Sequence, residues 1–352
     1  MRALLVFCLA CSGASGPSDV VEVDSARDTS DGVRSDFETS DVGASDIEAS
    51  DVAVEDTRVV DCEGWCATTP LPSRRQEIAA APFEDGFVVV GGFESPASST
   101  STVYFFDGEE WSELAPLPDS RHHMSVVNAD GELFVLGGMR GASFEALARS
   151  FVLRGGAWQE IAPAPTARAA GFAAHVDGSI YLLAGVGEGR TSAERLEDAR
   201  PVYRYHIAED RWSVGALMPS ASEHVAGAAG DDELFVFGGR QVSLEPTSAE
   251  VFAYDVGEDR WRSVTSMPMP RGGFAALRVG SEVWVGGGEE RAGVFASTHI
   301  FDLNTETWSE GHAMTSPRHG HAMAYLDGHV YAIGGGDAPG FATLSSVERL
   351  TL

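Results

Sequence analysis

Five arginines stand at equivalent points along the chain, each ten residues after a tryptophan. They are Arg75, Arg121, Arg168, Arg271 and Arg318, and Ser222 stands at the sixth such point. A guanidinium carries several N–H donors in a rigid fork, which suits the two oxygens of a carboxylate. Two interpretations are open. The arginines pair with neighbouring carboxylates or cap carbonyl groups at strand ends, or they form a ring that binds a carboxylate or an acidic peptide.

Groups able to transfer protons follow the sixth point. Glu223 and His224 come directly after Ser222, and we include all three among the candidate ligand-binding residues. Carboxylates and imidazoles serve as general acids and bases near neutral pH. If the arginine ring holds a carboxylate ligand, Glu223 or His224 is placed to move protons on it.

Histidines gather near the same points of the repeat. They are His122, His123, His224, His319 and His321. No cysteine or carboxylate spacing in the sequence turns them into a recognisable metal site. We therefore expect them to pack or to line a channel, and we expect no metal and no cofactor.

These residues lie in a sequence repeat that sets their positions. The tryptophans are Trp65, Trp111, Trp158, Trp212, Trp261 and Trp308, and 26 residues after each comes the first of a small-residue pair at Gly91, Gly137, Ala184, Gly238, Gly287 and Gly334. A fixed offset in six copies indicates a repeat architecture, in which neighbouring units bury each other's faces.

Each unit has the pattern of four short antiparallel strands. One starts at the tryptophan and ends near a proline-rich step, as at 114–118; a second consists of small and apolar residues, as at 124–129. A third, as at 133–136, ends in the glycine pair, and a fourth, as at 103–107, leads to the next tryptophan. An Asp-Gly turn that tolerates positive φ closes the hairpin between the second and third strands. These turns begin at Asp130, Asp177 and Asp327, and one residue later in the first unit, at Asp85. Four such strands make a propeller blade.

The region from Trp65 to Leu352 resembles the kelch family of β-propellers. The resemblance is carried by Gly-Gly at 91–92, 137–138, 238–239, 287–288 and 334–335, by Tyr254-Asp255 and Phe301-Asp302, and by the six tryptophans. The third repeat departs with Ala184-Gly185 and with His206 in place of an aspartate. The resemblance implies an all-β, six-bladed propeller, whose loops often bind partners. Copper-radical oxidases on kelch blades need a cysteine near a tyrosine, and no cysteine follows Cys66.

The two ends of the repeat region complete each other. The chain ends after a predicted strand at 346–350 with no tryptophan to follow, and it enters the first unit at Trp65 with no preceding strands. We predict that the strand at Trp65 becomes the outermost strand of the last blade, which closes the ring and removes its free edges.

Strand alternation sorts the connections between two faces of the ring. We name face A the end where the innermost strand of each blade begins; loops after the glycine pairs lie there, and the Asp-Gly turns lie on face B. The longest insertion, 185–200, is on face A, and we predict a short helix in it around Glu194, Arg195, Glu197 and Asp198. Gly185, Gly187 and Gly189 imitate a nucleotide-binding loop, but without a βαβ unit they indicate only a flexible loop.

The N-terminal residues indicate export. Residues 1–15 combine a charge with an apolar run, as in a signal segment, and Leu9-Ala10-Cys11 resembles a bacterial lipoprotein signal with lipidation at Cys11. Residues 16–61 are acidic, with Ser-Asp recurring every five residues, and are predicted to be a disordered tether. A calcium-binding array is the alternative, but the EF-hand pattern is absent. Residues 62–352 form the predicted propeller.

Cysteines outside this signal are confined to one short stretch. Cys62 and Cys66 flank Trp65 and could form a disulfide if Cys62 sits in a turn before the strand. An intermolecular pairing is the alternative in an oxidising compartment. The sequence leaves this choice open.

Charge limits the partners. The chain has 24 basic and 53 acidic residues, and all the basic ones are arginine. This balance argues against nucleic acid and anionic membranes. We expect a monomer that is exported and lipid-anchored at the outer membrane or cell surface, or is otherwise periplasmic or secreted. It would contact the membrane only through that anchor.

Two functions fit. The main expectation is a non-catalytic propeller that binds a protein or glycan with acidic groups through face A, because no nucleophile, metal set or paired carboxylates recur at channel positions. The alternative is a sugar-acid mutarotase or epimerase that resembles sialic acid mutarotases.

Overall fold

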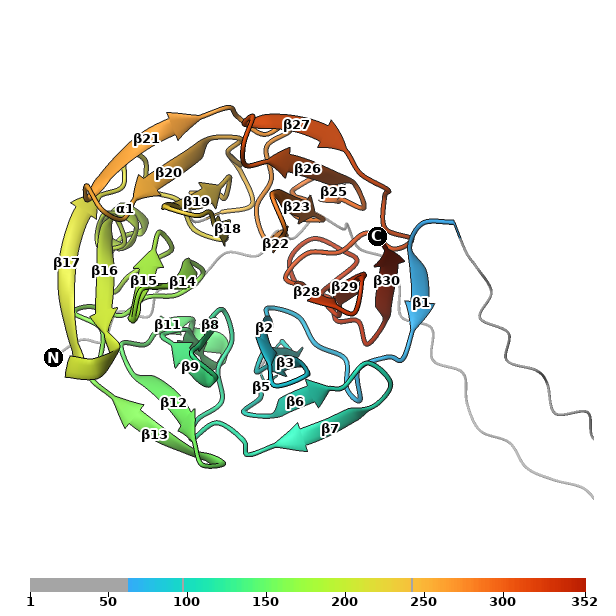
Figure 1. Ribbon diagram of the computed structural model, residues 1–352, viewed down its shortest axis with the longest axis horizontal. Helices are drawn as coiled ribbons and strands as arrows, with labels where there is room; N and C mark the ends of the chain where they lie inside the picture. The colour runs from blue at the N-terminus through green and yellow to red at the C-terminus, as the bar shows by residue number, and fades with distance from the viewer. Residues whose placement is uncertain (1–62, 97, 242) are drawn as a thin grey trace, which may run out of the picture. The chain divides into compact units, whose positions relative to one another are not determined.

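The described chain folds as a ring of six four-stranded antiparallel sheets (Figure 1). The structure is a computed structural model, and it describes residues 63–352 except 97 and 242. The first three blades, from the innermost strand outward, are β2 (Ala79–Phe83), β3 (Gly86–Val90), β6 (Val103–Phe106) and β7 (Trp111–Leu114); β8 (Ser125–Ala129), β9 (Glu132–Leu136), β12 (Ser150–Arg154) and β13 (Ala157–Ile161); and β14 (Phe172–Val176), β15 (Ser179–Leu183), β16 (Pro201–His206) and β17 (Arg211–Leu217).

The last three blades repeat the same order. They are β18 (Ala226–Ala229), β19 (Glu233–Phe237), β20 (Val251–Asp255) and β21 (Arg260–Val264); β22 (Ala275–Val279), β23 (Glu282–Gly286), β26 (Thr298–Asp302) and β27 (Thr307–Glu310); and β28 (Ala322–Leu326), β29 (His329–Ile333), β30 (Val347–Thr351) and β1 (Cys66–Thr68). The predicted all-β, six-bladed propeller is confirmed.

The N-terminal strand closes the last blade, as predicted. β1 pairs antiparallel with β30, with Cys66 opposite Arg349 and Thr68 opposite Val347. In Figure 1 the blue β1 lies beside the red β30. The Trp65 indole N–H donates to the carbonyl of His312, which lies between β27 and β28, at 2.7 Å. This bond also ties the N-terminal end of the described chain to its C-terminal part.

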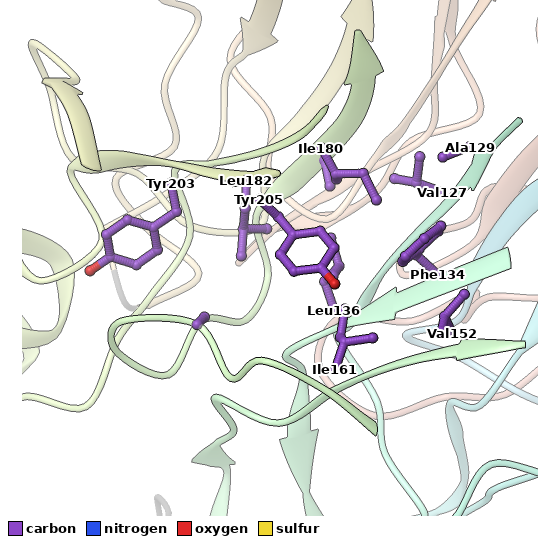
Figure 2. Close-up of a cluster of buried hydrophobic side chains, with 12 residues drawn as sticks. Val127, Ala129, Phe134, Leu136, Val152, Ile161, Ile180, Leu182, Tyr203 and Tyr205 are labelled. Atoms are coloured by element: carbon purple, nitrogen blue, oxygen red, sulfur yellow. The ribbon is translucent and has the colours of Figure 1, made fainter. Parts of the chain in front are cut away.

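Apolar residues of adjacent blades form the cores. Figure 2 shows one of them, in which Phe134 and Val152 of the second blade face Ile180 and Tyr205 of the third. The Phe134 and Tyr205 ring centroids are 6.2 Å apart. Burying a large apolar side chain contributes about 1.5–3 kcal/mol. Because these surfaces lie between blades, each blade depends on its neighbours.

Five of the six repeat tryptophans link the outer strands of adjacent blades through their indole N–H. Besides Trp65, four indoles donate to a carbonyl of the preceding repeat: Trp111 to Thr69, Trp158 to Ala115, Trp212 to Ala162 and Trp308 to Thr265. The Trp261 indole meets no hydrogen-bond partner within the described part of the chain. Only Trp65 of the six is buried; the other five are half-buried.

Most hairpin turns match the prediction, and one is displaced. Asp130, Asp177 and Asp327 have positive φ, as their Asp-Gly turns require. In the first blade the turn is Glu84–Asp85, and Gly86 is already the first residue of β3. A Cβ at Gly86 would lie 2.0 Å from the Phe106 carbonyl oxygen, so this glycine permits the close approach of β6.

The loops after the glycine pairs contain small elements. Three form two-stranded hairpins that were not predicted: β4 (Phe93–Ser95) with β5 (Ser98–Ser99), β10 (Met139–Arg140) with β11 (Glu145–Ala146), and β24 (Glu289–Glu290) with β25 (Gly293–Val294). A short 3₁₀ turn spans Gly141–Ser143 in one of these loops, and another, Ile207–Glu209, connects β16 to β17. The predicted helix is α1 (Ser192–Glu197), which starts with a capping box between Thr191 and Glu194.

Several expectations concern residues outside the described part. The signal segment, Cys11 and the tether at 16–61 all lie there, as does Cys62. Cys66 is disulfide-bonded. Among the described residues, no helix has the length and apolar character needed to cross a membrane.

Candidate functional site

The channel mouth on face A is built on a closed ring of backbone hydrogen bonds. In every blade, the residue two positions before the first residue of the innermost strand has φ between 52° and 65°. This residue also stands two positions after the arginine point. These ring residues are Glu77, His123, Ala170, His224, Gly273 and Gly320. Each donates its N–H to the carbonyl of the ring residue in the preceding blade, at 2.6–3.2 Å, and Glu77 closes the circle on Gly320.

Five of the candidate ligand-binding residues lie behind this ring. Arg75, Arg121, Arg168, Arg271 and Arg318 are all 0–1% exposed. In each, Nη1 donates to the carbonyl 16 residues later, which belongs to the first residue of the small-residue pair. The carbonyl at each of the six points accepts from the second glycine of the neighbouring blade's pair, at 2.8–2.9 Å.

Their surroundings favour the structural interpretation of the arginines. The Arg121 guanidinium lies over the Phe151 ring at 4.8 Å and pairs with Asp119. Burial lowers the pKa of Arg168 and Arg271 to about 10, so both stay charged at neutral pH. Their donors face inward to carbonyls, and a ligand at the mouth could not reach them.

A cluster of charged and imidazole side chains stands on the ring instead. We name it the mouth cluster, and it consists of Glu77, His122, His123, Glu223, His224, Arg240, Glu289 and His319. Backbone bridges bring together the segment before an innermost strand and the loop after the glycine pair, as in Glu223 with Arg240 and Gly272 with Glu289. The repeat thus places side chains from two loops of each blade at the axis.

Glu223, His224 and Arg240 form the centre of the mouth cluster. The Glu223 carboxylate contacts His224 Nδ1 and accepts from Arg240 Nε at 3.1 Å. Arg240 Nη1 donates to Glu289 at 2.7 Å, and its Nη2 lies 2.8 Å from His224 Nε2. Burial raises the pKa of Glu223, but His224 and Arg240 outweigh it and bring that pKa to about 2. The carboxylate is therefore ionised at neutral pH.

His122 and His123 of the cluster are neutral at physiological pH. Burial lowers the pKa of His122 to about 4 and that of His123 well below its ordinary value. His123 Nε2 lies 2.9 Å from His224 Nε2 and 3.1 Å from Glu77 Oε2. His321 lies deeper, and its ring nitrogens have no hydrogen-bond partner in the described residues. Burial also lowers the pKa of His321 well below its ordinary value, in agreement with channel lining.

Aromatic rings border the mouth cluster on one side. The Phe93 ring stacks on His122 with centroids 3.8 Å apart, and Phe144 lies 5.3 Å from His122. Phe341 is 6.0 Å from Phe93. Phe144 and Phe341 are 45% and 39% exposed, so they present apolar surface to solvent on this face.

Beneath the ring the channel is narrow. A cavity of about 90 Å³ is lined by Glu77, His123, His224 and their neighbours. It continues into about 200 Å³ bordered by small residues such as Ala80 and Gly227. The upper cavity has room for a few waters but not for a sugar. A sugar-sized ligand would meet the cluster from face A.

Sequence reasoning located part of this site. Ser222, Glu223 and His224 lie at the mouth, with the side chains of the last two in the cluster. It missed Glu77, Arg240 and Glu289. The available signal was position in the repeat, because Arg240 and Glu289 directly follow glycine pairs and Glu77 stands two residues after Arg75.

Comparison with known proteins supports the repeat assignment. Residues 198–350 match the model of the KLHDC2/KLHL20/DRC7 Kelch-repeats domain. A solved structure titled "Structure of YjhT" is similar with a TM-score of 0.68 and 16% identity, covering 79% of this chain and 95% of that one. No curated protein sequence matches. These findings support a kelch-repeat β-propeller, and at such low identity the likeness to YjhT shows the fold alone.

Proposed function

We propose that this kelch-repeat propeller is a sugar-acid mutarotase or epimerase with its active site at the mouth cluster. The observation that carries the proposal is the pairing of Glu223 with His224 beside Arg240. Mutarotation opens and recloses a hemiacetal ring. A base takes the proton of the anomeric hydroxyl while an acid protonates the ring oxygen, and the roles then reverse.

Each central residue has a part in that chemistry. The Glu223 carboxylate fixes the His224 ring through Nδ1, which leaves Nε2 directed to the mouth as the proton-transfer atom. Glu77, whose carboxylate lies within 4.8 Å of that atom, supplies the second proton-transfer group: in its protonated form it gives a proton to the ring oxygen while His224 Nε2 takes the proton of the anomeric hydroxyl. Arg240 is partly exposed and adds the positive charge that favours a substrate carboxylate.

The aromatic rings complete the substrate site in this proposal. Phe144 and Phe341 offer apolar surface next to the charged groups. Ligand sites commonly combine such surface with a few placed polar groups.

A non-catalytic binding propeller is the second candidate, and the exposed Phe144 and Phe341 rings favour it. The same face would then hold an acidic glycan or peptide without changing it. Either function is compatible with an exported monomer that is held at the cell envelope by a lipid on Cys11 and binds no nucleic acid.

The test is the rate at which a sugar acid equilibrates between its anomers. We would follow N-acetylneuraminic acid by proton NMR after dissolving one anomer with the full chain. We expect acceleration by the native protein and a loss of about 10²–10⁴-fold in Glu223→Gln and His224→Asn. Asparagine suits position 224 because it tolerates the positive φ found there.

His175→Gln, which changes a histidine on β14 away from the mouth, is the control and should retain the rate. Saturation transfer to the sugar without acceleration would support the binding function instead. If the native protein shows neither acceleration of anomer exchange nor saturation transfer to the sugar, a sugar-acid site is refuted.

A further inference from the structure

Three side chains of the mouth cluster converge on one point of the channel axis. Glu77, His123 and His224 occupy the same ring position in the first, second and fourth blades, and their ligand-capable atoms lie within 4.8 Å of one another. The corresponding residues of the other blades are Ala170, Gly273 and Gly320. A Cβ at Gly320 would lie 2.6 Å from Glu77 Oε1, so the small residues leave space for the three converging groups.

Hydrogen-bond partners assign the proton positions of the first histidine pair. His122 Nε2 lies 3.2 Å from the Gly141 carbonyl, which can only accept, so Nε2 carries the proton. With its ring proton on Nε2, His122 has an acceptor at Nδ1, and that atom contacts His123 Nδ1. His123 therefore donates from Nδ1, which leaves a lone pair on His123 Nε2.

The same reasoning applies to His224. Its Nδ1 contacts the Glu223 carboxylate, so Nδ1 carries the proton. Its Nε2 faces the donor Nη2 of Arg240 at 2.8 Å and carries a lone pair. Three acceptors thus meet, with 2.9 Å between His123 Nε2 and His224 Nε2 and 3.1 Å between His123 Nε2 and Glu77 Oε2. No proton lies between them in this assignment.

We propose that Glu77, His123 and His224 bind one divalent transition-metal ion, with zinc as the best match. Two imidazole nitrogens and one carboxylate oxygen, with a fourth position for water, are a common zinc donor set. Tetrahedral zinc with ligand bonds near 2.0–2.1 Å separates its ligand atoms by about 3.3 Å. The two distances from His123 Nε2 are within half an ångström of that value. The Glu77 and His224 atoms lie within 4.8 Å of each other, so metal binding would draw these two side chains together by up to about 1.5 Å.

Residues around the three ligands provide the support that a metal site needs. A ligating histidine usually donates its other N–H to a carboxylate or another acceptor, which fixes the ring. Glu223 accepts from His224, and His122 accepts from His123. His319 Nδ1, 3.8 Å from Glu77 Oε1, borders the free oxygen of the carboxylate.

Arg240 is the group that competes with the metal. Its Nη2 donates a hydrogen bond to the lone pair of His224 Nε2, which is the lone pair that would bind the metal. Its other bonds, to Glu223 and Glu289, do not involve the three ligands, so Arg240 can give up one bond and stay anchored. The ion pairs also offset the repulsion between this guanidinium and the metal.

The inference does not rest on the proposed function, because metal binding is measured without substrate. We would treat the full chain with EDTA, alkylate its free thiols so that they cannot bind zinc, and dialyse it against limiting zinc. Metal content would be counted by mass spectrometry. We expect one zinc per chain, its loss in Glu77→Gln and His123→Asn, and affinity about 10–100-fold lower in Glu223→Gln.

His175→Gln controls for surface histidines and should bind one zinc. Should His123→Asn fail to fold, Glu77→Gln alone decides, since Glu77 reaches the surface and glutamine keeps its size. A native protein without zinc would overturn the proposal and indicate a shared proton at this point. Equal zinc in the native protein and the ligand variants would show adventitious binding and overturn it too.

Discussion

At the scale of single residues, the molecule uses arginine for two different purposes. The five buried arginines each donate to a strand-end carbonyl, and four of them lie over an aromatic ring, as Arg121 lies over Phe151. Arg240, the arginine of the mouth cluster, instead binds the carboxylates of Glu223 and Glu289 at the axis. The difference is position: the buried set precedes the innermost strands, whereas Arg240 follows a glycine pair.

A buried arginine should therefore matter for stability and not for ligand binding. Arg271→Met leaves the Gly287 carbonyl without its donor, whereas the Ser297 carbonyl keeps the N–H of Gly287 at 3.2 Å. A buried unsatisfied group costs about 1–3 kcal/mol, so we expect urea denaturation to give a free energy of unfolding lower by about that amount. Arg260→Met, which removes an exposed pair with Glu258, should change it by less than about 1 kcal/mol. Equal losses would contradict the structural role.

Buried histidines make stability depend on pH. The folded-state pKa of His122 is about 4, below its ordinary 6.5, because burial disfavours the charged ring. The unfolded chain binds the extra proton first, so the stability that neutral His122 contributes is complete above pH 6.5 and is lost as pH falls towards 4. The depressed pKa of Glu223, about 2, works in the same direction between about pH 4.5 and 2.

His122→Gln should make the free energy of unfolding depend less on pH between about 6.5 and 4. The His122 shift corresponds to about 3 kcal/mol at most. We would measure the free energy of unfolding in urea at several pH values between 4 and 7 for the native protein and the variant. An unchanged slope in the variant would show that other groups cause the dependence. His175→Gln again serves as the matched control.

At the scale of elements, the closing strand β1 carries a specific expectation. Deleting residues 62–70 removes β1 and the Trp65 indole and exposes an edge of β30. We expect the melting temperature to fall by about 5 °C or more, since losing a buried tryptophan costs about 3–5 kcal/mol. Deleting 17–60 should leave it unchanged.

That deletion also removes two cysteines, so a second control is needed. Replacing Cys62 and Cys66 by serine keeps the strand and measures how much the disulfide contributes to the melting temperature. If the strand deletion melts like this double variant, ring closure contributes nothing beyond the disulfide.

The blades were predictable because their signals are local. Alternating apolar residues, turns such as Asp130-Gly131 and a constant tryptophan-to-glycine offset define strands and their order without long-range information. The mouth cluster was not predictable in the same way. It depends on left-handed backbone at Glu77, His123 and His224 and on which loops converge at the axis. Position in the repeat gave Ser222, Glu223 and His224. Arg240 differs from other loop arginines by its place directly after a glycine pair, but that place gains meaning only once the loops are known to meet at the axis.

At the scale of the whole molecule, a nearly symmetric scaffold carries an asymmetric site. The same ring position holds carboxylate, imidazole, methyl or hydrogen in different blades. The backbone repeats while the side chains at the axis do not, so the site can vary without disturbing the fold. The overlap of the zinc ligands with the proton-transfer groups has a consequence here: zinc on His224 Nε2 would remove the base, so zinc should inhibit mutarotation.

The backbone ring at the mouth also affects how the channel entrance attracts ions. A helix ends in unpaired N–H groups and therefore has a positive pole, at which anions collect. The six ring bonds run head to tail in one circle, so none of their N–H groups is left over. Unlike a helix terminus, the ring therefore offers no unpaired N–H to an anion. The side chains on the ring decide which ions the entrance attracts.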